Sequence, residues 1–175
     1  MAAQVSSVSR PLRKALIGGL MSVSLFFSVA GTGWAEPNNH RFTVVSHDGT
    51  TRSVASGTIN AVGTASFQSD VQFPVAGQSF SGTSTQTYPE GSLNFTFQGV
   101  FDSVSFNPAA CIVIDTATGT FQVTGGSGAY QGASGSGSFS ETDIVVLQRT
   151  AEGCGAPIHF TAIVHNTGQL SVTSS

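Results

Sequence analysis

The sequence has little charge, and what it lacks excludes several classes of partner. Lysine and tryptophan are absent after residue 35, where only three basic side chains remain, Arg41, Arg52 and Arg149. All nine acidic residues lie in this same part, which gives it a formal net charge of −6. Three dispersed arginines cannot neutralise a row of phosphates. We therefore expect no nucleic-acid partner and no binding to anionic membrane surfaces.

The N-terminal segment lacks the length of a membrane span but has the three parts of an export signal. A basic stretch at 10–14 precedes an apolar run over 15–30, and small residues follow at the cleavage-reading positions within 33–35. The apolar run is shorter than the roughly 20 residues that a span requires. We interpret residues 1–35 as a signal peptide and predict one domain over 36–175. The protein is then secreted or periplasmic, with no membrane span after signal removal.

Cysteine is also scarce, and its two copies are typical of one structural disulfide. An exported domain would use Cys111 and Cys154 for a single bridge, because thiols oxidise outside the cytoplasm. Closing a loop of this length would restrict the unfolded chain by about 4 kcal/mol. A nucleophilic thiol would need a basic partner nearby in the sequence, and neither cysteine has one.

The four histidines have no spacing that indicates a metal site. His159 and His165 share one face of an extended strand, but there they lie about 20 Å apart, too far for one ion. His40 and His47 are likewise distant if the chain is extended. We therefore expect exposed histidines, no metal and no cofactor.

The chain after residue 35 has the pattern of strands and not of helices. No window places apolar residues at helical spacing, whereas alternation with a period of two recurs. In Leu93-Asn94-Phe95-Thr96-Phe97-Gln98 the three apolar side chains share one face. Tyr88-Pro89-Glu90-Gly91 is typical of a tight turn, because proline fixes φ at the second position and glycine suits the fourth. The predicted strands are 41–46, 54–64, 65–75, 79–87, 92–101, 112–115, 118–124, 136–147, 158–165 and 169–173.

These segments predict an all-β fold, a single antiparallel eight-stranded β-barrel, with a β-sandwich as the alternative. The barrel is the first choice because closing the sheet removes exposed edge strands. One core suffices in either arrangement, since a chain of this length buries roughly two-thirds of its unfolded surface.

The segment Thr124–Gly137 contains six glycines, and four known motifs fail in it. A dinucleotide fingerprint fails at Gln131, a calcium-binding nonapeptide at Tyr130, and a nucleophile elbow around Ser127 at Ala129. A phosphate-binding loop would need a lysine that this part of the chain lacks. We therefore interpret the glycines as turn and bulge residues, with the tyrosine packing inward.

The stretch Phe121–Gly132 (FQVTGGSGAYQG), continued by GSGSF at 135–139, resembles a known family. Its strand, glycine turn, aromatic and second glycine segment are similar to those of the allene oxide cyclase barrel-like family, which is related in fold to plant dirigent proteins. The resemblance implies an eight-stranded antiparallel barrel with an apolar cavity, often assembled as a trimer. It carries over no catalytic residue, because the N-terminal half presents no matching motif.

A small barrel either holds one small ligand or fills its interior with side chains. Our hypothesis is an interior pocket that binds a lipid-like or aromatic molecule, and the alternative is a closed core. The residues expected to line the interior are Leu93, Phe95, Phe97, Phe121, Val123 and Tyr130. The predicted function is a binding or structural role. The alternatives are a cyclase or isomerase for a hydrophobic substrate, and a surface or matrix protein that acts through its exterior.

The interior decides between these functions, because a wholly apolar interior favours carriage and a buried acid beside a cavity favours catalysis. Glu141 and Asp143 share a strand face at roughly 6.6 Å, near the separations in paired glycosidase carboxylates. Such pairs are commonplace on solvated strands, so we interpret them as surface charges. Asp102 and Asp115 have less support, and the catalytic residues stay unknown.

Two segments are apolar on both faces of an extended strand. After Gly99, alternation places Val100, Val104 and Phe106 on one face and Phe101 on the other, and Ile144–Leu147 is apolar throughout. A strand that is apolar on both sides needs cover on its outer face. We therefore expect a homo-oligomer, a trimer or a dimer.

Overall fold

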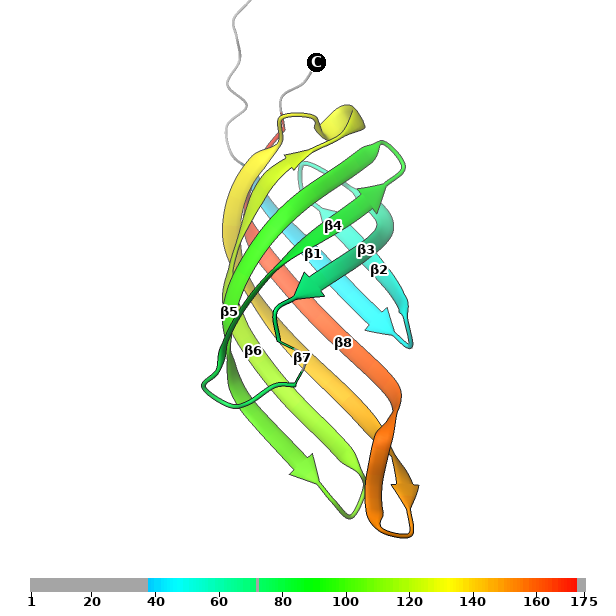
Figure 1. The fold of residues 1–175 in the computed structure, drawn as a ribbon. Coiled ribbons are helices and arrows are strands. Elements are labelled where there is room, and N and C mark those ends of the chain that lie inside the picture. The colour runs from blue at the N-terminus through cyan, green and yellow to red at the C-terminus, as the bar shows by residue number, and fades with distance from the viewer. Residues whose placement is uncertain (1–37, 72, 173–175) are drawn as a thin grey trace, which may run out of the picture. The chain divides into compact units, whose positions relative to one another are not determined.

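Eight antiparallel strands are hydrogen-bonded in a closed, barrel-like ring (Figure 1). The computed structural model describes residues 38–71 and 73–172, so the predicted signal peptide lies outside the described residues. Each strand pairs with the next along the chain, and the last pairs with the first. The strands are β1 (Asn38–His47), β2 (Thr50–Ser56), β3 (Ala61–Ser69), β4 (Ser79–Tyr88), β5 (Gly91–Asn107), β6 (Ile112–Gly126), β7 (Ser134–Thr150) and β8 (Gly153–Ser171). The predicted fold class is confirmed, with a ring in place of a sandwich.

The predicted strand boundaries fail where the chain turns. The prediction of one strand over 54–64 is wrong, because β2 ends at Ser56 and β3 begins at Ala61. Gly57 has a φ of +125°, and the Asn60 side chain accepts its N–H at 3.3 Å and donates to its carbonyl at 2.9 Å. Two pairs of segments predicted as separate strands are instead continuous, as β6 and β8.

The strands differ in length, and this difference divides the ring into two parts. Strands β1 to β4 have 7 to 10 residues, whereas β5 to β8 have 15 to 19. The β4–β5 pairing ends at Ser79–Val100 and the β1–β8 pairing at His47–Thr161. Beyond these pairs β5 to β8 continue alone (Figure 1). We call this part the extended sheet; it contains 101–107 of β5, 153–160 of β8 and the β6 and β7 residues between them.

A disulfide links the two hairpins of the extended sheet. Cys111 precedes β6 in the β5–β6 turn, and Cys154 lies at the start of β8. The two residues are bonded, with their Cα atoms 5.4 Å apart, so the predicted disulfide is confirmed. A disulfide of this kind indicates an oxidising compartment.

The other part of the ring is filled with side chains. Phe42, Leu93 and Leu170 are almost completely buried there. Inside this part, the hydroxyls of Ser53 and Tyr88 lie 2.7 and 2.6 Å from Oε1 of Gln86, so these buried polar groups have partners. We call the buried cluster the packed core; it consists of Phe42, Ala55, Ile59, Tyr88, Leu93, Phe95, Phe121, Val123, Tyr130, Ala133 and Leu170.

The glycine-rich segment closes the packed core. After β6 ends, a single 3-10 turn at Gly128–Tyr130 leads toward β7, and it is the only helical segment among the described residues. Tyr130 is buried with its ring centroid 6.1 Å from that of Tyr88. Gly128 has a φ of +60°, and an added Cβ would lie 2.3 Å from the Glu90 carbonyl oxygen. The interpretation as turn glycines with an inward tyrosine is confirmed. No helix in the described part is long and apolar enough to cross a membrane.

Candidate binding cavity

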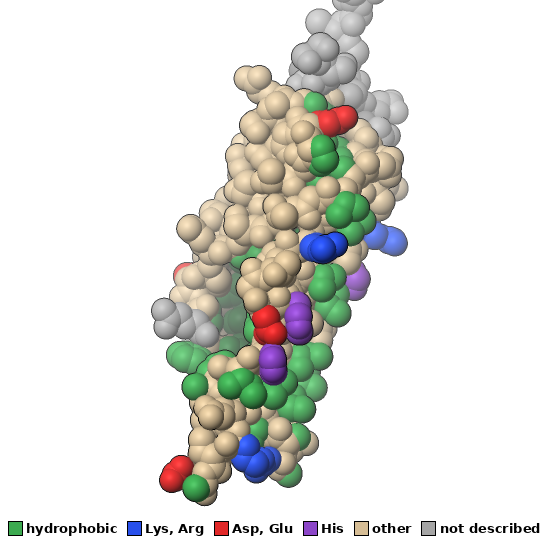
Figure 2. Space-filling view, turned by 90° about the vertical axis from the view of Figure 1, so that its right-hand side faces the viewer, with side chains coloured by type: hydrophobic (Ala, Val, Ile, Leu, Met, Phe, Trp, Pro, Cys, Tyr) green, Lys and Arg blue, Asp and Glu red, His purple; other side chains and the backbone are tan. Residues whose placement is uncertain are grey.

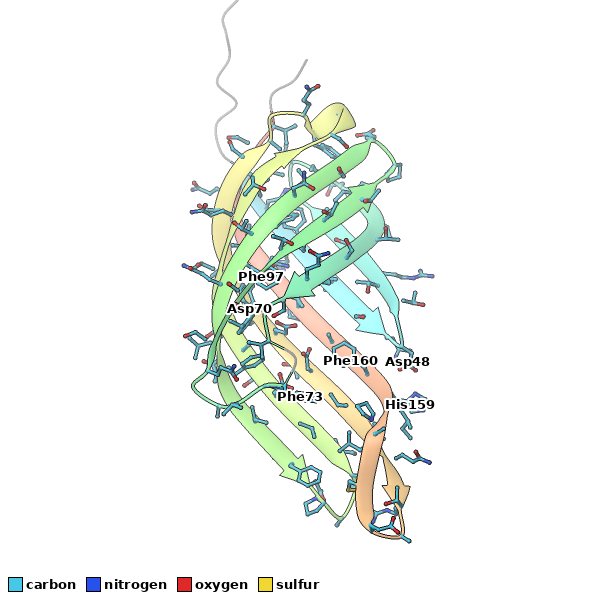
Figure 3. The ribbon with its side chains drawn as sticks, viewed as in Figure 1. Asp48, Asp70, Phe73, Phe97, His159 and Phe160 are labelled. Carbon is cyan, nitrogen blue, oxygen red and sulfur yellow. A yellow bond between two sulfur atoms is a disulfide. The ribbon has the colours of Figure 1, made fainter. Side chains whose placement is uncertain are left out.

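A cavity of about 610 Å³ lies against the inner face of the extended sheet. Its wall comes from the long strands, from the short strands β3 and β4, and from the loop residues 70–71 and 73–78 between them. A volume of this size is within the range of small-molecule sites. Phe73 on the loop lines the cavity although 78% of its surface is exposed, so the cavity opens to solvent (Figure 3). Phe160 lines it from β8 (Figure 3).

The loop that borders the cavity is anchored at both ends. The sequence predicts strand as far as residue 75, but β3 ends at Ser69. At the start of the loop, the backbone N–H and the hydroxyl of Ser81 each donate to the Asp70 carboxylate at 2.8 Å. At its end, the N–H of Gly77 donates to the Phe101 carbonyl at 2.7 Å. These bonds hold the loop beside the cavity.

Aromatic rings line the end of the cavity that adjoins the ring. The Phe80 ring centroid lies 4.6 Å from that of Phe101, 6.1 Å from that of Phe139 and 6.2 Å from that of Phe97. The Phe139 ring lies on the backbone of Gly119, where an added Cβ would approach it to 2.5 Å. Aromatic faces and edges of this kind bind apolar and aromatic molecules.

Three acidic side chains also line the cavity, and all come from two neighbouring strands. Asp115 of β6 lies directly opposite Asp143 of β7, and Glu141 lies two residues before Asp143 in β7, on the same face. The interpretation of Glu141 and Asp143 as surface charges is wrong, because both face the cavity. Alternation along the strand fixed their common face correctly but did not show which face was inside.

Burial makes these carboxyl groups weaker acids than usual. Burial raises the pKa of Glu141 to about 7, and the charge of Asp115 acts in the same direction. Burial also raises the pKa of Asp143 to about 8, aided by the charges of Glu141 and Asp115. The pKa of Asp115 is raised by burial as well. The cavity therefore holds acids whose protonation changes near neutral pH.

We call Asp115, Glu141 and Asp143 the acidic wall of the cavity. It has no positive partner in the described part of the chain. Asp115 is 2% exposed, and Oδ1 of Asp115 and Oδ1 of Asp143 have no hydrogen-bond partner. Within the described residues 38–71 and 73–172, the pairs at ion-pair distance join Asp48 to His47 and to His159. None of them involves a cavity acid. Arg149, the arginine of the extended sheet, donates instead to the carbonyls of Pro108 and Ala109.

The residues predicted to line the interior divide between the two parts of the ring. Phe95, Phe97 and Phe121 border the cavity, and Phe95 and Phe121 belong also to the packed core. The other three lie in the packed core and away from the cavity: Leu93, Val123 and Tyr130. Whether the lining residues bind a ligand stays a prediction. Asp115, Glu141 and Asp143 are the lining residues that the sequence did not single out as a group.

The prediction of exposed histidines is wrong for His40. It points inward from β1 and is 4% exposed, and burial lowers its pKa to about 4. The other described histidines lie on the exterior, where histidine side chains lie beside an acidic side chain on one face (Figure 2). There Oδ2 of Asp48 lies 3.4 Å from Nε2 of His47 and 2.8 Å from Nδ1 of His159. No group of three metal-binding side chains occurs in the described residues.

The predicted faces of β5 change at a β-bulge. The register with β6 shifts between Phe101 and Ser103, so Val104 pairs with Asp115 on the cavity side. Val104 and Phe106 therefore do not share the outer face with Val100, as simple alternation had predicted. The prediction that self-association covers an apolar outer face therefore no longer depends on Val104 and Phe106.

Three comparisons with known proteins were negative. No family model, no curated protein and no solved structure matches this chain. The eight antiparallel strands closed in a ring are the part of the allene oxide cyclase resemblance that the structure shows.

Proposed function

We propose that this protein binds a small, mostly apolar molecule in the cavity of the extended sheet. The observation that carries the proposal is an open cavity of about 610 Å³ lined by at least four packed phenylalanine rings. The packed core fills the adjoining part of the ring, and Phe95 and Phe121 belong both to it and to the cavity wall. A solvent-accessible apolar hollow of this kind is typical of a ligand-binding site.

The proposal places this binding outside the cytoplasm and within the allene oxide cyclase barrel-like family. The Cys111–Cys154 disulfide supports an exported location. The ring of eight strands and the glycine turn that buries Tyr130 support the family. Because fold does not imply function, the family contributes the architecture to the proposal and no activity.

Calorimetric titration with naphthylethanol, an uncharged aromatic probe, tests the binding. Val113 lines the cavity, and Val113→Trp would fill part of it. Val62 is 58% exposed on the outer surface and does not line the cavity, so Val62→Trp is the matched control. We expect the unchanged protein and the control to bind alike, and Val113→Trp to bind roughly tenfold more weakly or worse. Equal binding by all three proteins, or no binding by any, overturns the proposal.

Acid–base catalysis on an apolar substrate, of the cyclase or isomerase type, is the second candidate. The observation that favours it is the acidic wall, because a catalytic acid works best when its pKa lies near the working pH, and burial brings the pKa of Glu141 to about 7. The test incubates the protein with lipid-derived epoxides and with phenolic substrates. Turnover that falls roughly 100-fold in Glu141→Gln supports catalysis. Turnover that is absent, or equal in the variant, removes this candidate.

The proposal also includes self-association, as a trimer or a dimer. Ile114 and Ile144 are directly paired on neighbouring strands and are 42% and 38% exposed on the outer face. Ile163 and Val45, a second exposed pair, continue the apolar surface onto β8 and β1. Light scattering at tens of micromolar should give a mass two or three times that of one chain. A monomeric mass, or an Ile144→Asp variant with the oligomer intact, contradicts self-association through this surface.

A further inference from the structure

The acidic wall of the cavity holds three carboxyl groups that no positive side chain of the described residues neutralises. Asp115 and Asp143 lie directly opposite each other on β6 and β7, and like charges in this position destabilise a sheet. Glu141 adds a third carboxyl group on the same face. Buried carboxylates are normally paired with a cation or fully hydrogen-bonded. Here one oxygen of each aspartate has neither kind of partner.

The elements around the acidic wall supply no counter-charge. From β8, Phe160 and Val164 line the cavity; from β5, Phe97 and Phe101 do; and from the loop, Phe73 does. None of these side chains is titratable. The titratable groups that face the cavity from the described residues are thus the three acids themselves, and the described arginines are not paired with them.

We propose that the ligand of this cavity is an apolar organic cation, an amine with an aromatic or aliphatic body. Its ammonium group lies at the acidic wall, between Asp115 and Asp143 and near Glu141, and its body packs against the phenylalanine rings. This inference rests on the proposed function, because it names the chemical class of the molecule that the cavity binds.

Both walls of the cavity favour a cation over a neutral or anionic ligand. An ammonium group offers three donors, and the carboxyl groups of Asp115 and Asp143, which line the cavity, are acceptors. A cation also relieves the repulsion between the two carboxylates, which a neutral ligand does not. Aromatic rings attract a cation through their faces, and rings line the cavity beside the acids. An anionic ligand would meet three carboxyl groups and no positive side chain.

Binding of a cation should release protons from the acidic wall. A bound ammonium favours ionised carboxylates, so it lowers their pKa values and protons leave the site on binding. The affinity for an amine should therefore rise as the pH rises from about 6 to about 8, because burial raises the pKa values of Glu141 and Asp143 into that range. The affinity for an uncharged molecule of the same shape should change little.

Three probes with the same ring test the inference: naphthylethylamine, naphthylethanol and naphthylacetic acid. At pH 8 the amine is protonated and the acid is ionised. Calorimetric titration of the full protein should give the order amine, alcohol, acid, with the amine binding roughly tenfold or more tightly than the alcohol. Titration in two buffers of different ionisation enthalpy should show protons released with the amine only.

Variants locate the effect at the acidic wall. Asp143→Asn and the double variant Asp115→Asn/Asp143→Asn keep side-chain size and should reduce the amine preference to about twofold or less. Asp102→Asn is the matched control, because Asp102 is exposed and its carboxylate accepts a bond from Thr118 instead of lining the cavity. Thermal unfolding verifies that each variant is folded.

The outcomes separate this inference from the function on which it rests. If the alcohol binds as tightly as the amine, or if the asparagine variants keep the amine preference, the inference is overturned and the binding of an apolar molecule stands. If none of the three probes binds, both fail. Preferential amine binding that the asparagine variants lose, and that Asp102→Asn keeps, supports the inference.

Discussion

The packed core and the cavity use the same alternating strands for opposite purposes. Beside the packed core, the buried polar groups of Ser53, Tyr88 and Gln86 satisfy one another, although Gln86 also borders the cavity. In the cavity, the aspartate oxygens of the acidic wall have no partners. A closed polar network stabilises a fold, whereas unpaired buried acids reduce its stability. The contrast is between a hydrogen-bonded polar network and a group of carboxyl groups without counter-charge, and it is the contrast on which the proposed ligand site rests.

The difference arises from strand length. Where all eight strands are present, side chains from every side meet and fill the interior. Where β1 to β4 end, β5 to β8 continue, and their inward residues face a cavity that the segment between β3 and β4 also lines. The extra length of β5 to β8, together with β4 and the segment between β3 and β4, therefore forms the cavity wall.

Replacing a phenylalanine by alanine in the packed core and in the cavity wall should give the largest difference in the free energy of unfolding. Phe42 is 1% exposed in the packed core, and Phe42→Ala should cost about 3–5 kcal/mol in the free energy of unfolding, because it leaves a void in a closed interior. Phe101→Ala should cost less than half as much, since the Phe101 ring already borders an open space. Urea unfolding of both variants measures the difference. Equal losses would remove the distinction between the two parts.

Removing the disulfide should affect the cavity more than the packed core. The double variant Cys111→Ser/Cys154→Ser should lose about 2–4 kcal/mol of unfolding free energy, because the bridge no longer restricts the unfolded chain. The two hairpins of the extended sheet should also exchange their amide hydrogens faster, while β1 to β4 change little. Hydrogen exchange measures this by segment, and uniform acceleration over all strands would argue against two separate parts.

The acidic wall should make stability depend on pH with an unusual sign. Burial raises the pKa values of Glu141 and Asp143, so the folded state binds more protons than the unfolded state between about pH 4 and pH 8. The free energy of unfolding should therefore fall as the pH rises through this range. At pH 8, Asp143→Asn should be more stable than the unchanged protein, and this difference should shrink as the pH falls toward 4.

Removing one hydroxyl from the polar network of Ser53, Gln86 and Tyr88 should have the smallest effect on the free energy of unfolding. Tyr88→Phe removes a hydroxyl that lies 2.6 Å from Oε1 of Gln86, and it should cost about 1 kcal/mol at any pH between 5 and 8. The loss is small because Ser53 still donates to the same oxygen. A loss that varied with pH would show that the packed core is coupled to the acidic wall.

Much of the fold could be predicted from the sequence, because its signals are local. Alternation at Leu93–Gln98 placed a strand, Pro89 and Gly91 placed a turn, and two cysteines in an exported chain placed a bridge. The glycines of 124–137 were interpreted correctly because each competing motif failed at a single residue. All of these inferences use neighbours along the chain.

The site could be predicted only in part, because its position depends on long-range pairing. The alternation of Glu141 and Asp143 gave a shared face, but only the pairing with Asp115 and the closure of the ring place that face inside. The bulge after Phe101 moves the later residues of β5 to the opposite face from the one that alternation predicts. No residue type at this position indicates a bulge. Strand length, which creates the cavity, was underestimated for every one of the four long strands.

A crystal structure of the protein with naphthylethanol tests the central claim, that the extended sheet forms a binding cavity for an apolar molecule. The account predicts the naphthyl ring between Phe80, Phe97 and Phe139, with its hydroxyl toward Asp115. A cavity filled by water alone, or a probe found only on the outer surface, would contradict it.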